Sequence, residues 1–212
     1  MNEEHATQIQ SLLDKEASRD LVNLYCRAAD RHDHELMRSL YHPDAIDDHG
    51  SFFKGLAMDF VDQLPTIQEP MEILHHNVTT HNIELNGNDA EGEVYILAFH
   101  KVKTDTGAFD LLIGGRYLDR YQKREGEWKF SHRAVLADWA TVVDPSGVNL
   151  EHPVIAGSHI GRPGPDDPSY GFFAGFSRVT AVSYTHLTLP TTIPSWGCRG
   201  GGGGYKGGGG GG

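Results

Sequence analysis

The hydrophobic pattern of this chain changes its period near residue 70, from that of a helix to that of strands. Between Ile9 and Ala29, apolar side chains recur every three or four residues, which predicts a long amphipathic helix. The recurring positions are Leu13, Ala17, Leu21, Leu24 and Ala28. Four later segments instead alternate and are rich in Val, Ile, Leu, Phe and Tyr, as is typical of strands. They are residues 73–85, 91–103, 109–123 and 127–140.

Hairpin turns separate these four segments. The turn sequences are Asn86-Gly87-Asn88, Asp105-Thr106-Gly107 and Glu125-Gly126, and short loops of this composition join antiparallel strands. We therefore expect an α+β domain in which a curved antiparallel sheet wraps around the long N-terminal helix. Such an arrangement leaves an opening through which a small ligand can enter.

Two short helices and one strand are expected between the long helix and the meander. A helix over residues 34–41 should end before Pro43, because the residue that precedes a proline avoids the α conformation. A strand can follow at residues 45–49, and a second helix at 55–64 should be closed by Pro65.

Changes in composition near residues 145 and 178 divide the sequence into three parts. Residues 1–145 form the expected domain, and the Pro- and Gly-rich stretch that follows predicts an extended arm over 146–178. Arms of this kind often pack on a neighbouring subunit. The remaining residues, 179–212, contain "VSYTHLTLPTT", which resembles translated sequencing-adaptor read-through, and a near-pure glycine run. We expect a non-native or disordered tail there and exclude it from fold reasoning.

Charge and cysteine content restrict the partners. A formal net charge of -11 argues against nucleic acid and anionic membranes, because both need clustered Lys and Arg. Residues 1–20 lack the basic start and apolar core of a signal peptide, and no run of about eighteen apolar residues occurs. We therefore expect a cytoplasmic protein. Cys26 and Cys198 cannot build a disulfide framework or a paired-cysteine zinc site.

Three stretches of the sequence resemble the SnoaL-like branch of the NTF2-like superfamily. They are "LVNLYCRAADRHDHELMRSLYHPDA" (21–45), "HHNVTTHNIELNGNDAEGEVYILAFH" (75–100) and "LLIGGRYLDRYQKREGEWKFSHRAVLADW" (111–139). The similarity spans about residues 10–145, and the arm sequence "GRPGPDDPSY" (161–170) is familiar in the same group. The resemblance implies an NTF2-like cone. The group includes scytalone dehydratase, bile-acid 7α-dehydratase, hexachlorocyclohexane dehydrochlorinase and polyketide cyclases, so it specifies the fold better than the substrate.

The resemblance implies a catalytic pair of Asp30 and His76. Asp30 stands in "AADRHD" at the end of the first helix, and His76 stands eight residues before Glu84 of "NIEL". A histidine can take and return a proton near neutral pH, and a carboxylate beside it fixes its tautomer. The alternatives are a helix-end carboxylate bonded to backbone and a surface or core histidine. Strict alternation puts His76 on the face opposite His75 and His81, unless a bulge intervenes.

Five further residues are candidates for substrate binding: Tyr25, His49, His100, Tyr117 and Arg133. The resemblance implies that Tyr25 or His100 donates a hydrogen bond to a developing oxyanion, and that His49 takes the place of a pocket tyrosine. Arg133 can be a buried cation that faces the pocket. Tyr25 and Tyr117 have core positions as alternatives, as does His100. The substrate contacts of scytalone dehydratase on the third long strand are not retained, and the strand aspartate of the bile-acid enzyme falls near Ala98. The resemblance therefore implies neither a scytalone-like nor a steroid substrate.

Together these residues predict a cofactor-independent lyase of the dehydratase type, or a related isomerase or cyclase, that acts on a small apolar cyclic molecule. This chemistry requires neither an organic cofactor nor a metal. The polar stretch from His42 to His49 also lacks the spacing of a metal site, so no metal is expected there. The alternative is a non-catalytic protein that binds a small ligand or supports a partner enzyme, for example one similar to a dioxygenase small subunit. Exposed strand surface and the arm favour a homodimer or homotrimer.

Overall fold

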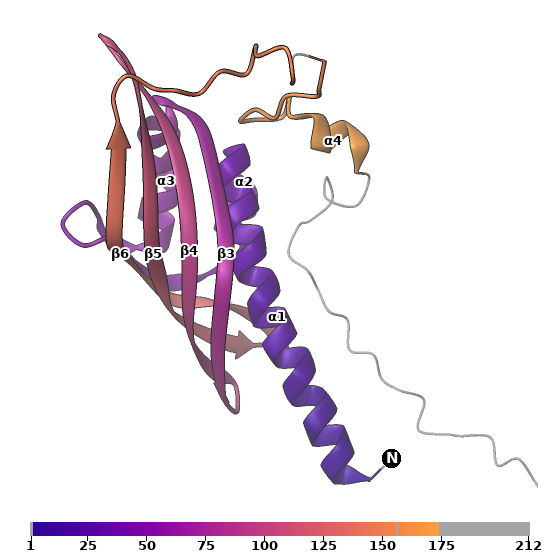
Figure 1. The fold of residues 1–212 in the computed structure, drawn as a ribbon. Coiled ribbons are helices and arrows are strands. Elements are labelled where there is room, and N and C mark those ends of the chain that lie inside the picture. The colour runs from indigo at the N-terminus through magenta and orange to yellow at the C-terminus, as the bar shows by residue number, and fades with distance from the viewer. Residues whose placement is uncertain (1, 156, 174–212) are drawn as a thin grey trace, which may run out of the picture.

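A computed structural model of the chain describes residues 2–155 and 157–173. Ten elements follow one another in these ranges (Figure 1). The helices are α1 (Glu3–Arg31), α2 (His34–Ser39), α3 (Ala57–Gln68) and α4 (Pro168–Phe172). The strands are β1 (Tyr41–Asp48), β2 (Lys54–Leu56), β3 (Met71–Asn86), β4 (Asp89–Thr104), β5 (Gly107–Arg124) and β6 (Glu127–Val143). The α+β class and the four-strand meander predicted from the sequence are confirmed.

The six strands form one curved sheet in the order β2-β1-β6-β5-β4-β3. The four long strands pair antiparallel through hairpins, as predicted. The curved antiparallel sheet expected from the sequence contains one parallel pair, because β1 runs parallel to β6, with Asp47 opposite Arg133. These two strands are far apart in sequence, so no hairpin fixes their relative direction. The sheet is therefore mixed.

Helix α1 lies along the sheet and packs mainly against β3 (Figure 1). Its buried face includes Leu21, Val22, Tyr25 and Ala28, close to the helical stripe predicted from the sequence. Helices α2 and α3 pack against each other, and α3 packs on β1. The core therefore lies between the helices and the inner face of the sheet.

Helix α3 continues past Pro65, where the sequence predicted its end. A proline removes one intrahelical hydrogen bond, but the last turn is held by buried side chains. Gln68 is 4% exposed, donates to the carbonyl of Ala29 (3.2 Å) and contacts Nε2 of His34 (2.8 Å). Tertiary contacts at Gln68 thus outweigh the local cost at Pro65.

A bulge interrupts β3 between Val78 and Thr80. The extra residue reverses the alternation, so His81 turns to the same face as His76. Its Nε2 lies 3.2 Å from the hydroxyl of Tyr121. Burial lowers the pKa of His81 to about 4. Strict alternation predicts His81 on the face opposite His76; this prediction was wrong because of the bulge.

The arm packs on helix α1 of its own chain. Arg31 Nη1 donates to Asp167 Oδ2 at 2.8 Å, and the amide of Gly164 donates to the carbonyl of Arg31 at 2.7 Å. The hydroxyl of Tyr170 donates to Asp33 Oδ2 at 3.0 Å. The arm is thereby tied to the end of α1 at several points. The tail expected from residue 179 lies outside the described residues. Among the residues that the structure describes, no helix is long and apolar enough to cross a membrane.

Candidate functional site

The last turn of α1 and the first half of β3 bring Asp30 and His76 together. Helix α1 ends at His32, which adopts the left-handed conformation (φ 52°), and Asp30 lies just before this end. His76 Nδ1 lies 2.6 Å from Asp30 Oδ1, and both side chains are 11% exposed. The backbone amide of His76 also donates to the same carboxylate, at 3.2 and 3.1 Å. The backbone amide and the imidazole ring of His76 thus both hold the carboxylate of Asp30 in place.

This geometry selects the tautomer of His76. The Asp30 carboxylate accepts hydrogen bonds, so the ring nitrogen that faces it, Nδ1, carries a proton and donates it. In the neutral ring Nε2 is then the basic nitrogen and can take a proton. An oriented imidazole beside a nearly buried carboxylate is the arrangement that general-base chemistry requires.

His100 lies next to this pair on β4. The rings of His76 and His100 have centroids 5.4 Å apart. Burial lowers the pKa of His100 to about 4, and the nearby His76 adds to this effect, so His100 is neutral at pH 7. Its Nε2 is buried and has no hydrogen-bond partner among the described residues. A neutral imidazole here can donate a hydrogen bond to a ligand that reaches His76.

Arg133 lies in a separate cluster inside the cone. Its guanidinium is fully buried and binds Asp119 through two hydrogen bonds, Nε to Oδ1 at 2.7 Å and Nη2 to Oδ2 at 2.6 Å. The rings of Tyr25, Tyr117 and Phe130 surround it, with centroids 4.0 to 4.1 Å from the guanidinium carbon. Burial raises the pKa of Tyr25 and of Tyr117, so both stay neutral. The structure therefore places two of the predicted residues, Tyr25 and Tyr117, around a buried ion pair that includes a third, Arg133.

His49 lies in a third group, at the end of β1. Its Nε2 is 2.8 Å from Asp47 Oδ1, and its ring stacks on Phe60 with centroids 4.4 Å apart. Asp47 is fully buried and accepts a hydrogen bond from the Tyr41 hydroxyl at 2.5 Å. No described contact joins His49 to Asp30 or His76.

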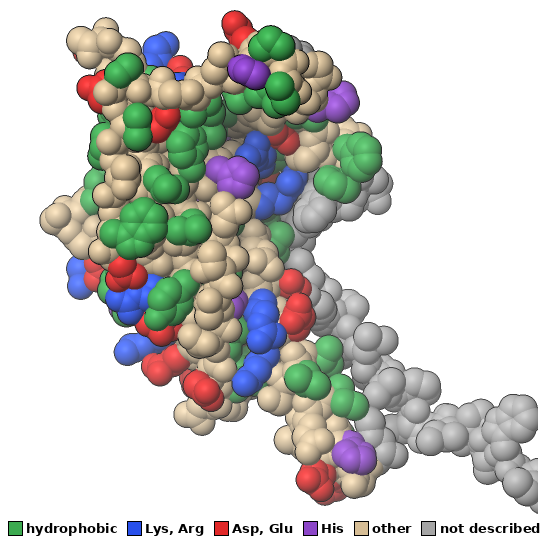
Figure 2. All heavy atoms as spheres, in the orientation of Figure 1, with side chains coloured by type: hydrophobic (Ala, Val, Ile, Leu, Met, Phe, Trp, Pro, Cys, Tyr) green, Lys and Arg blue, Asp and Glu red, His purple; other side chains and the backbone are tan. Residues whose placement is uncertain are grey.

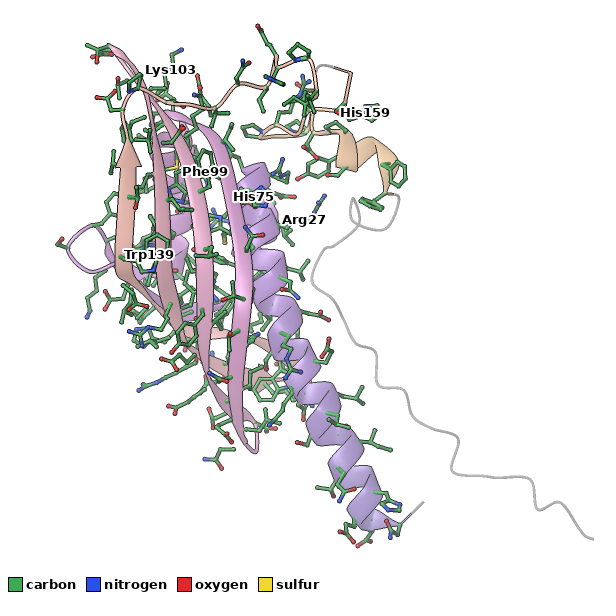
Figure 3. The ribbon with its side chains drawn as sticks, viewed as in Figure 1. Arg27, His75, Phe99, Lys103, Trp139 and His159 are labelled. Carbon is green, nitrogen blue, oxygen red and sulfur yellow. The ribbon has the colours of Figure 1, made fainter. Side chains whose placement is uncertain are left out.

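A cavity of about 330 Å³ opens beside Asp30. Its walls come from the end of α1, the start of β3 and the arm. Figure 2 shows histidine and Lys or Arg side chains gathered beneath the arm on this face, and Figure 3 shows that His75 comes from β3 and His159 from the arm. The lining residues are Asp30, Arg31, Glu72, Ile73, Leu74, His75, Leu150, Ile155, Ser158, His159, Ile160, Gly161, Arg162 and Pro163. The structure thus places Asp30 on the wall of a ligand-sized space, whereas His76, His100 and the Arg133 cluster are not among its lining residues.

Sequence reasoning missed the carboxylates that hold these clusters. Asp119 alternates with Tyr117 and Tyr121 on β5, and that pattern could have placed it on the inner face. Asp47 is two residues from His49, a spacing that also puts both on one face of a strand. Within the described ranges, no group of three or more His, Cys, Asp or Glu side chains is arranged to hold a metal ion.

A family model described as a SnoaL-like domain matches residues 10–134. Among solved structures, a scytalone dehydratase-like protein from Novosphingobium aromaticivorans is 20% identical, with 67% of this chain and 95% of that one covered and a TM-score of 0.58.

A hexachlorocyclohexane dehydrochlorinase of type 2 is also 20% identical, with 69% and 98% covered and a TM-score of 0.61. The type 3 enzyme from Novosphingobium barchaimii is 18% identical, with 67% and 98% covered and the same TM-score. At these identities the likeness shows the fold alone. No curated protein matches the sequence.

Proposed function

The chain belongs to the SnoaL-like domain family, and from this premise we propose that it is a cofactor-independent lyase of the dehydratase type, or a related isomerase or cyclase. The substrate is a small, mainly apolar cyclic molecule. The observation that carries the proposal is the 2.6 Å contact between His76 and Asp30, a residue that also lines a ligand-sized cavity. Structural neighbours that are a dehydrochlorinase and a scytalone dehydratase-like protein support this class of reaction.

In the proposed reaction, His76 Nε2 removes a proton from a carbon next to a carbonyl or another activating group. The electron pair left on that carbon forms a double bond as a neighbouring hydroxyl or halide departs. Asp30 stabilises the imidazolium that forms, because its carboxylate accepts the hydrogen bond from Nδ1. The neutral ring of His100 donates to the oxygen on which negative charge develops, a contact worth about 3 kcal/mol in a dry site. Where the leaving group is a hydroxyl, the imidazolium of His76 gives the proton to it as the carbon–oxygen bond breaks, so that it leaves as water; a halide leaves as the anion.

Ligand screening with product analysis tests this proposal. Thermal shift and product formation are measured for the wild type, Asp30→Asn and His76→Ala with hydroxylated cyclic ketones, phenols and chlorinated rings. The expected result is stabilisation of all three proteins by one class and product from the wild type alone. Unchanged turnover in His76→Ala rules the mechanism out.

The packed interior around Arg133 favours a second candidate, a non-catalytic ligand-binding or accessory protein. Tyr25, Tyr117 and Phe130 fill the space between α1 and the sheet, where a substrate of the predicted kind would otherwise lie. Binding of the screened compounds without product in any variant supports this candidate. Tight co-purification with a large iron-sulfur subunit would specify a dioxygenase accessory role.

We also propose that the protein is a cytoplasmic homodimer or homotrimer. The outer face of the sheet exposes Leu97 (39%), Leu112 (40%) and Trp139 (49%), and Figure 2 shows apolar side chains gathered on this face. Contiguous apolar patches of this kind mark interaction surfaces. Light scattering coupled to gel filtration gives the oligomeric state, and a monomer at micromolar concentration contradicts this part of the proposal.

A further inference from the structure

The cavity beneath the arm carries basic side chains that the Asp30–His76 pair does not use. We propose that it binds an organic anion: an amphipathic molecule with a ring-sized apolar body and one carboxylate or sulfonate. The anionic group lies against Arg162, His75 and His159, and the apolar body lies on the aliphatic wall. The identification of this ligand as the substrate rests on the proposed function, whereas its binding does not.

The charges that line the cavity divide into paired and unpaired groups. Asp30 contacts His76 at 2.6 Å, and Arg31 contacts Asp167 at 2.8 Å. The carboxylates in the lining are Asp30 and Glu72. Burial raises the pKa of Asp167. Hydrogen bonds from Ser169 and from the backbone amide of Arg162, together with the charge of Arg31, outweigh burial and lower this pKa to about 2. Arg31 is therefore held in its ion pair throughout the physiological range.

The unpaired groups are mainly basic. Arg162, His75 and His159 line the cavity, and their side chains form no ion pair within the described part of the chain. Arg162 is exposed and its guanidinium is always charged. It can contact a carboxylate or sulfonate through two parallel hydrogen bonds. Arg162 supplies a fixed positive charge, and the imidazoles of His75 and His159 can donate hydrogen bonds to the same anionic group.

The rest of the wall is aliphatic. Six side chains supply it: Ile73, Leu74, Leu150, Ile155, Ile160 and Pro163. A cavity of about 330 Å³ holds a molecule of one or two rings. The chain as a whole carries a net charge of -11, so general electrostatic attraction does not bring an anion here. Recognition has to be local, which makes it sensitive to a single residue.

Asp30 connects this cavity to the proposed chemistry, because its side chain belongs both to the wall and to the pair with His76. An apolar body in the cavity lies against the Asp30 end of that pair. The anionic group has to bind at the Arg162 side, since it would be repelled by the Asp30 carboxylate. The proposal therefore narrows the substrate class from apolar rings to rings that carry an acid group.

Two fluorescent probes that share an apolar body test the proposal. The anionic probe is 8-anilino-1-naphthalenesulfonate, and the neutral one is N-phenyl-1-naphthylamine, which lacks the sulfonate. Their dissociation constants are measured with the full chain at pH 7.5 for the wild type and Arg162→Gln. Arg120→Gln is the matched control, because Arg120 is 67% exposed and lies on β5, outside the cavity lining.

We expect Arg162→Gln to weaken binding of the anionic probe about tenfold, the size of a charge-assisted contact, and to change the neutral probe less than about twofold. Arg120→Gln should change neither. An equal effect of Arg162→Gln on both probes, or no effect on the anionic one, overturns the proposal. Turnover assays of the wild type and His76→Ala separate the two proposals. If the wild type binds the anionic probe but neither protein turns over any substrate, the anion site stands and the lyase proposal fails. Turnover that is lost in His76→Ala, together with anionic-probe binding that is unchanged in Arg162→Gln, removes the anion site alone.

Discussion

Replacing Arg133 by methionine leaves the carboxylate of Asp119 buried without its cation. Both side chains are fully buried and joined by hydrogen bonds of 2.6 and 2.7 Å. After the change, Asp119 keeps one described hydrogen bond, which the Tyr121 hydroxyl donates to it at 2.9 Å. Removing one partner of a buried pair costs about 3–5 kcal/mol of the free energy of unfolding. That is a large part of the roughly 5–15 kcal/mol that stabilises a typical domain.

Urea unfolding followed by tryptophan fluorescence measures this loss. With a slope of about 2 kcal/mol per molar urea, the midpoint should fall by about 2 M in Arg133→Met. The double variant Arg133→Met with Asp119→Leu should recover most of it, because no buried charge is left unpaired. Arg120→Met is the control and should shift the midpoint little, since its pair with Glu91 is exposed. A loss below about 1 kcal/mol in Arg133→Met would refute a structural role for the ion pair.

Three further changes test other parts of the structure. The pKa of His100 is about 4 in the folded chain and near 6.5 in the unfolded chain, so the unfolded state binds more protons between these pH values. The free energy of unfolding should therefore fall as the pH drops from 6.5 to 4, by up to about 3 kcal/mol. Urea titration at each pH should show a smaller fall in His100→Gln, and an unchanged profile in that variant contradicts this. Gly115→Ala should lower the thermal midpoint by several degrees, since its added methyl meets a backbone carbonyl, whereas Gly147→Ala, which meets nothing, should not; equal shifts would show that the β5–β6 packing is described wrongly. Asp167→Asn weakens the ion pair that ties the arm, so limited proteolysis should cut the arm faster than in the wild type, and equal rates would mean that the remaining contacts suffice.

The sequence predicted the architecture well because its signals are local. The helical stripe through Leu21 and Leu24 and the turns at Gly87 and Gly126 each fix their own neighbourhood. The pairing of β1 with β6 has no such signal, because it joins segments that are some ninety residues apart in the chain. The continuation of α3 beyond Pro65 likewise depends on Gln68, whose partners lie on other helices.

The candidate site divides in the same way. Placing Asp30 near His76 relied on a resemblance, and the structure brings the two side chains together; their catalytic role stays a prediction. Alternation does not locate the bulge next to Val78, so it placed His81 on the face opposite His76, whereas the structure places both on one face. The ion pair of Arg133 with Asp119 depends on register between β5 and β6, which hydrophobic pattern alone does not specify to the residue. Tertiary polar pairs are therefore the part of this molecule that sequence patterns leave undetermined.

The proposed proton abstraction by His76 can be observed without waiting for a leaving group to depart. Hydroxylated cyclic ketones are incubated in deuterated water with the wild type or with His76→Ala, and loss of the proton next to the carbonyl is followed by proton nuclear magnetic resonance. We expect enzyme-dependent exchange in the wild type and exchange at the solvent background rate in His76→Ala. Exchange at the same rate in both proteins, or at background in the wild type with every ketone that binds, would contradict it.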